Sequence, residues 1–153
     1  MYKNHTLLPT QLAYVQYFSF ADKYLEVYAF IAKKIQEPGL SKIEKDKFFT
    51  LSESLMQQSF EFQKKGLSNL TYEIKCSVND LTYAVKFATK TIHDTYRSSN
   101  LKDVISGLVA IAEILNDSVF SSTNLKILPK LIKKLIHDVN ELKKTNNLPY
   151  FFI

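Results

Sequence analysis

The chain has 153 residues, 46% of them hydrophobic and 23% charged, which suits one folded domain and excludes a disordered chain. It has only three glycines and four prolines, and this scarcity of turn-forming residues disfavours a β-sandwich or β-barrel. The formal net charge is +5, and Arg97 is the only arginine, so bidentate recognition of bases or phosphates is disfavoured.

The first predicted helix runs from about Thr10 to Gln36 and ends before Pro38-Gly39, a helix-breaking pair. Two lines of apolar side chains follow it at helical spacing. We expect the first line to pack against a neighbouring helix; it consists of Tyr14, Phe18, Ala21, Leu25, Tyr28, Ala32 and Ile35. The second apolar line consists of Tyr17, Phe20, Tyr24, Val27 and Ile31.

The second apolar line has two interpretations. It fits a central helix that touches several neighbours, or a surface that binds a partner or a second copy of the chain. Tyrosine and phenylalanine are enriched at interfaces, so the candidate partner-binding residues here are Tyr17, Phe20 and Tyr24.

The next two helices are bounded by capping signals. The second opens at Ser41 with the capping-box pattern Ser-x-x-Glu and ends near Gly66. The third is predicted from after Asn69 to about Arg97, with Cys76 inside it as a small, partly buried side chain. A lone cysteine and the lack of a clear signal peptide favour a reducing, cytoplasmic location.

The fourth predicted helix runs from after Asn100 to about Phe120. It is apolar on nearly every side, which is typical of the buried centre of a bundle, and it is too short to span a bilayer. The fifth follows Ser121 to Asn124 and reaches about Lys144. Pro129 predicts that its regular part begins only at Leu128 or Pro129.

Positive charge gathers in the fifth helix: from Ser121 onward the chain carries a net +4 of its total +5. A basic amphipathic helix can dock an acidic protein or lie on an anionic membrane, although lysines also serve as a plain solvated face. The candidate contact residues are Lys126, Lys130, Lys133 and Lys134.

The last six residues are unusually apolar for a chain end, with Tyr150, Phe151, Phe152 and Ile153 following a proline. They are expected either to fold into a groove of the bundle or to anchor in a partner. We therefore predict a single helical-bundle domain over 1–147 and an apolar tail over 148–153.

The sequence offers no catalytic, cofactor-binding or metal-binding residues. None of His5, His93 or His137 has a glutamate three residues before it, as a di-iron bundle requires, and one cysteine with three histidines does not predict a zinc site. No glycine-rich phosphate loop occurs. No cofactor is predicted.

The sequence as a whole predicts an all-α, antiparallel helical bundle of four to five helices. The favoured function is a non-enzymatic protein-interaction module of inhibitor, immunity, adaptor or effector type. Its partner is another protein, an acidic one or a second copy being candidates. The alternative is an amphipathic coat or anchor protein on a membrane or hydrophobic inclusion surface. A hydrolase or nuclease with a dispersed site is a third, weaker hypothesis, and nucleic-acid binding is disfavoured.

Overall fold

The computed structural model describes residues 8–68, 72–74, 76–94, 100–117 and 122–146, apart from the side chains of 72, 122–125, 145 and 146. Within these ranges the predicted all-α bundle is confirmed. Its five helices are α1 (Tyr14–Ile35), α2 (Lys42–Leu67), α3 (Val78–His93), α4 (Leu101–Asn116) and α5 (Ser122–Asn146).

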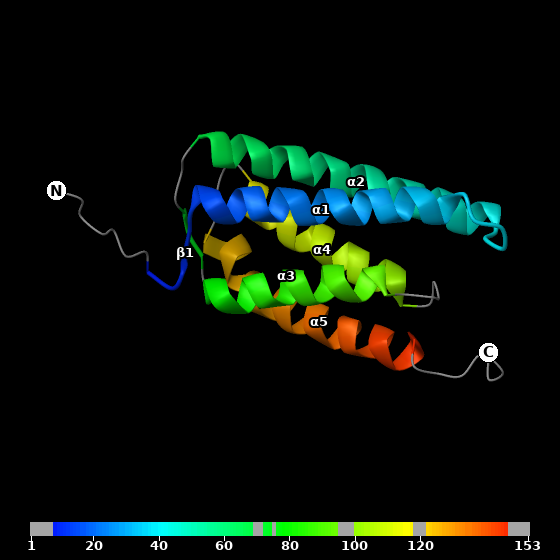
Figure 1. Cartoon of the computed structure of the whole chain (residues 1–153). Coiled ribbons are helices and arrows are strands. Elements are labelled where there is room, and N and C mark those ends of the chain that lie inside the picture. Colours follow the sequence, from blue (N-terminus) through cyan, green and yellow to red (C-terminus); the bar gives the residue numbers. More distant parts are fainter. Residues whose placement is uncertain (1–7, 69–71, 75, 95–99, 118–121, 147–153) are drawn as a thin grey trace.

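Successive helices run in opposite directions, as Figure 1 shows. The neighbouring helices α1 and α2 form an antiparallel pair at one side of the bundle, and α5 lies at the opposite side. The helix α4 packs against both α2 and α5, while α3 packs against α1 and α5. The apolar α4 therefore lies near the centre, as its composition predicts, and its buried residues include Val104, Leu108 and Leu115.

A short antiparallel strand pair closes one end of the bundle. Strand β1 (Gln11–Leu12) pairs with β2 (Tyr72–Glu73), and the amide of Ile74 donates to the carbonyl of Thr10 at 2.7 Å. The prediction that the third helix begins after Asn69 is wrong, because Tyr72 and Glu73 form β2 and Ser77 caps α3 only afterwards. Ile74, which directly follows β2, is buried in the core.

The fifth helix also departs from the prediction. It is helical from Ser122, and Pro129 lies inside it, where proline removes one backbone hydrogen bond. The fully buried Leu128 holds this turn against the core, which offsets that loss. The capping box at the start of α2 is present as predicted, with the Glu44 amide donating to the Ser41 hydroxyl at 3.2 Å.

The core between α1 and α2 is built around the ring of Phe62. The ring centroids of Tyr17, Phe20 and Tyr24 lie 6.3, 5.5 and 5.2 Å from that of Phe62, distances typical of favourable aromatic pairs. Two buried hydrogen bonds fix the helices around this cluster. The Ser59 hydroxyl donates to the carbonyl of Ala21 at 2.8 Å, and the Tyr24 hydroxyl donates to the carbonyl of Leu108 at 2.5 Å.

Replacing Phe62 by alanine is expected to lower the free energy of unfolding by about 3–5 kcal/mol, because the fully buried ring leaves a cavity among three aromatic neighbours. Phe60→Ala is the matched control on the same helix. Its ring is 53% exposed, so its loss is expected to stay within about 1 kcal/mol. Urea denaturation followed by circular dichroism measures the free energy of unfolding of both variants. Equal losses of that free energy would contradict the assignment of Phe62 to the core and Phe60 to the surface.

Candidate functional site

The structure supports the first of the two interpretations of the second apolar line of α1, that of a central helix that touches several neighbours, while the first apolar line lies only partly in the core. Tyr17, Phe20 and Tyr24 are buried in the core, at most 2% exposed, so their interpretation as a partner-binding surface is wrong. They are instead the centre of a helix that contacts α2, α3 and, through the Tyr24 hydroxyl, α4. Burial raises the pKa of Tyr24 far above its ordinary value, so this hydroxyl stays protonated as the donor to Leu108.

The first apolar line, expected in the core, is partly at the surface. Tyr14, Phe18 and Leu25 are 37–48% exposed. They lie on the flank of α1 away from α3, because the opposite flank carries Phe30, whose ring meets His93 of α3. This flank borders the seam with α2, where the ring of Phe18 lies over Gly66 so closely that an added Cβ would come within 3.0 Å of it.

A matching row of exposed apolar side chains follows α2. Phe49, Phe60 and Leu67 are 53–74% exposed, and their spacings of eleven and seven residues place them on one side of the helix. The opposite flank faces α4, since Asn116 of α4 donates to Gln58 there. We call these two rows together the α1–α2 strip; its members are Tyr14, Phe18, Leu25, Phe49, Phe60 and Leu67.

The strip lacks a strong charge of either sign. Glu53 stands seven residues before Phe60 and so lies on the same side of α2 as the row, while Asp22 and Lys64 are exposed beside the strip. Exposed apolar side chains scattered singly are ordinary, but these six all belong to one packed helix pair, which makes the strip a candidate interaction site. Sequence reasoning found the α1 half of this strip and assigned it to the core.

The predicted lysines of α5 are at the surface. Lys126, Lys130, Lys133 and Lys134 are all exposed. The inward side of the helix is fully occupied by core residues, among them Leu128, Leu135 and Val139. The Lys134 ammonium lies 2.7 Å from the Asp138 carboxylate, and this hydrogen bond raises the pKa of Lys134. The other predicted contact residues, Tyr150, Phe151, Phe152 and Ile153, lie outside the described residues.

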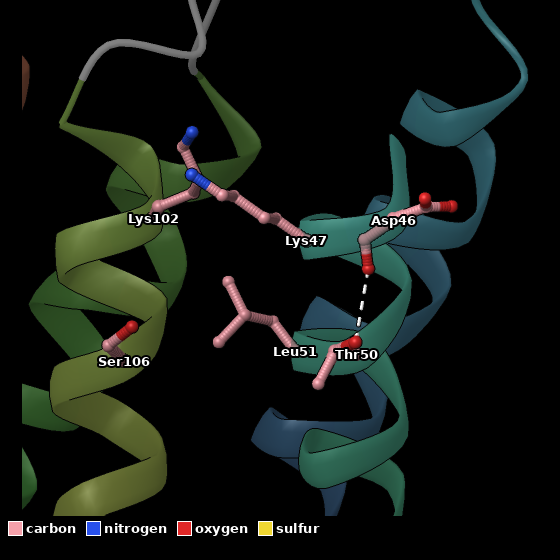
Figure 2. A pocket seen from close by; sticks show the side chains of 6 residues that line it. All are labelled: Asp46, Lys47, Thr50, Leu51, Lys102 and Ser106. Carbon is pink, nitrogen blue, oxygen red and sulfur yellow. Dashed lines mark hydrogen bonds between the residues drawn. The ribbon is translucent and has the colours of Figure 1, made fainter. Parts of the chain in front are cut away.

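A cavity of about 420 Å³ lies between α2 and α4. Figure 2 shows Lys47 and Leu51 reaching from α2 toward α4, and Lys102 and Ser106 on the facing wall. Asp46 and Thr50 complete the lining, and the Thr50 hydroxyl donates to the carbonyl of Asp46 at 3.1 Å. Sequence reasoning missed this cavity, because its two walls become neighbours only once α2 packs against α4.

A smaller hollow of about 250 Å³ brings together Glu26, Phe30, Lys33 and His93. The Nε2 atom of His93 is 3.8 Å from a carboxylate oxygen of Glu26, which is longer than a hydrogen bond. A carboxylate–histidine pair can serve acid–base chemistry, but the residues that line this hollow include no serine, threonine or cysteine nucleophile. Within the described residues, no group of three His, Cys, Asp or Glu side chains is placed to hold a metal ion.

Comparison with known proteins adds no assignment, because no family model, no curated protein and no solved structure matches the chain. Among the described helices, none combines the length and the apolar character that crossing a membrane requires.

Cys76 lies just before α3 and not inside a helix, contrary to expectation. Burial of its thiol, reinforced by the nearby Asp80 carboxylate, raises the pKa of Cys76 to about 11. Since the thiolate is the nucleophile, we expect alkylation by iodoacetamide to be slow at pH 8 and to rise up to about pH 11. The urea-unfolded chain is the control and should reach half its maximal rate near pH 8.5. Equal dependence of the alkylation rate on pH in the folded and unfolded chains would contradict the raised pKa of Cys76.

Proposed function

We propose that this chain is a protein-interaction module that docks another protein through the α1–α2 strip. The observation that carries the proposal is the pair of adjacent rows of exposed apolar side chains along one helix–helix seam. Four of the six side chains are aromatic, and aromatic residues are the usual anchors of protein interfaces. Covering them would remove apolar surface from water at about 25 cal/mol per Å².

The form of the strip suggests an α-helical partner surface. Two antiparallel helices carry its rows side by side, so an amphipathic helix lying along the seam would contact both at once. Such helices present apolar residues at spacings of three, four and seven. The mixed charges at the edges, such as Asp22 and Lys64, suit a polar rim that excludes water and fixes orientation.

The exposed lysines of α5 offer a separate contact for an acidic partner, because α5 itself lies at the side of the bundle opposite the α1–α2 pair. They support the coat or anchor alternative less well. An amphipathic helix binds a membrane by burying its apolar side in it. In α5 that side packs in the core, so insertion would require the bundle to open. The protein-interaction module of inhibitor, immunity, adaptor or effector type therefore stays the proposal.

Phe60→Asp and Leu67→Asp should abolish docking, because each places a carboxylate in the middle of an apolar contact. Affinity capture from a native lysate, with the retained protein identified and quantified by mass spectrometry, measures the effect. We expect at least about a tenfold loss of the retained protein for each variant. Thermal unfolding should stay within a few degrees of the parent chain, since both side chains are largely exposed.

Tyr83→Asp on α3 is the matched control, because Tyr83 is 56% exposed and lies outside the strip. Its capture should equal that of the parent chain. An equal loss for Tyr83→Asp, or undiminished capture by the strip variants, would contradict the proposal. A chain that ends at Asn147 tests the apolar tail separately, since a loss of capture with unchanged stability would give the tail a contact of its own.

A further inference from the structure

We infer that the cavity between α2 and α4 binds a small amphipathic anion, one with a carboxylate or phosphate head and an apolar body. This site is distinct from the α1–α2 strip, because it lies on the opposite flank of α2. The cavity is an open hollow of about 420 Å³, so a ligand bound there would keep one side in water. Both of its walls are regular helices, which hold the lining residues in fixed positions.

Two lysines give the cavity its positive charge. Lys47 on α2 and Lys102 on α4 extend toward each other across the top of the cavity (Figure 2). Within the described part of the chain, neither ammonium group has an ion-pair or hydrogen-bond partner. The Lys102 ammonium lies over the ring of Phe48, 5.9 Å from its centroid, and an anion between the two lysines would add the counter-charge that this contact does not supply.

The nearby carboxylates do not fill this role. Figure 2 shows the Asp46 carboxylate turned away from α4, although Asp46 belongs to the lining. Asp103, next to Lys102, acts on Lys134 of α5 and raises its pKa, which places that charge on the α5 side of α4. Lys102 also lies in the first turn of α4, where the helix dipole adds partial positive charge. The balance of charge at the cavity is therefore positive.

The remaining lining defines what the anion must carry with it. Ser106 lies one turn beyond Lys102 and can donate a hydrogen bond to the head group. Below the lysines, the side chain of Leu51 offers an apolar wall. A free inorganic anion would leave this apolar wall in contact with water, so the site favours an anion with an attached apolar body.

The test is an NMR titration of the ¹⁵N-labelled full chain with decanoate below its micelle concentration, with decanol and inorganic phosphate as separate probes. We expect saturable shifts of the amides around Leu51 and Ser106 with decanoate, and binding that weakens at high salt. Lys47→Gln and Lys102→Gln should each weaken decanoate binding by about tenfold, the size expected for one charge-assisted contact.

Lys90→Gln is the matched control, because Lys90 is an exposed lysine of α3 away from the cavity, and it should leave decanoate binding unchanged. Thermal unfolding of each variant shows that the fold is kept. Decanol binding as tightly as decanoate would overturn the role of the lysines, and phosphate binding as tightly would overturn the role of the apolar wall. Amide chemical-shift changes confined to other surfaces would overturn the site itself. So would a loss of decanoate affinity in Lys90→Gln equal to that in Lys47→Gln and Lys102→Gln.

Discussion

The contact of Phe62 with three rings of α1 is the constraint on which the rest of the structure depends. One ring thus contacts three side chains of α1, those of Tyr17, Phe20 and Tyr24. These contacts fix the rotation of α1 about its own axis relative to α2. The Tyr24 hydroxyl extends the same constraint to α4 through Leu108. Once the second apolar line faces inward, a rigid helix must carry part of the first line outward. The exposed strip is thus a consequence of how the core is packed.

Helical spacing identified the two apolar lines of α1 but could not rank them, because both repeat with the same period. What decides between them is the facing residue on α2. The ring of Phe62 packs against side chains of the second line. Gly66 has no side chain to cover Phe18, whose ring lies over it and stays 37% exposed. Ile74 shows a similar limit, because it stands four residues before Val78, at helical spacing, although it directly follows the strand β2 and precedes the start of α3. The exposed lysines of α5 and the capping box of α2 depend on local sequence, and both were predictable.

The helix α2 links the two proposed sites. One of its flanks carries Phe49, Phe60 and Leu67 into the strip, and the other carries Lys47 and Leu51 into the cavity beside α4. The two sites differ in chemistry as well as in place. The strip is apolar with mixed charges at its edges and suits a protein surface, whereas the cavity is positive above an apolar wall and suits a small anion. The basic face of α5 is a third, separate surface.

The most direct test of the central claim is photo-crosslinking in a native lysate, with p-benzoylphenylalanine placed at Phe60 in one chain and at Tyr83 in another. Both positions are about half exposed, so unspecific collisions should label them equally. We expect one discrete crosslinked protein from position 60 and none from position 83. A discrete product from position 83, or the same faint background from both, would contradict the assignment of the α1–α2 strip as the docking surface.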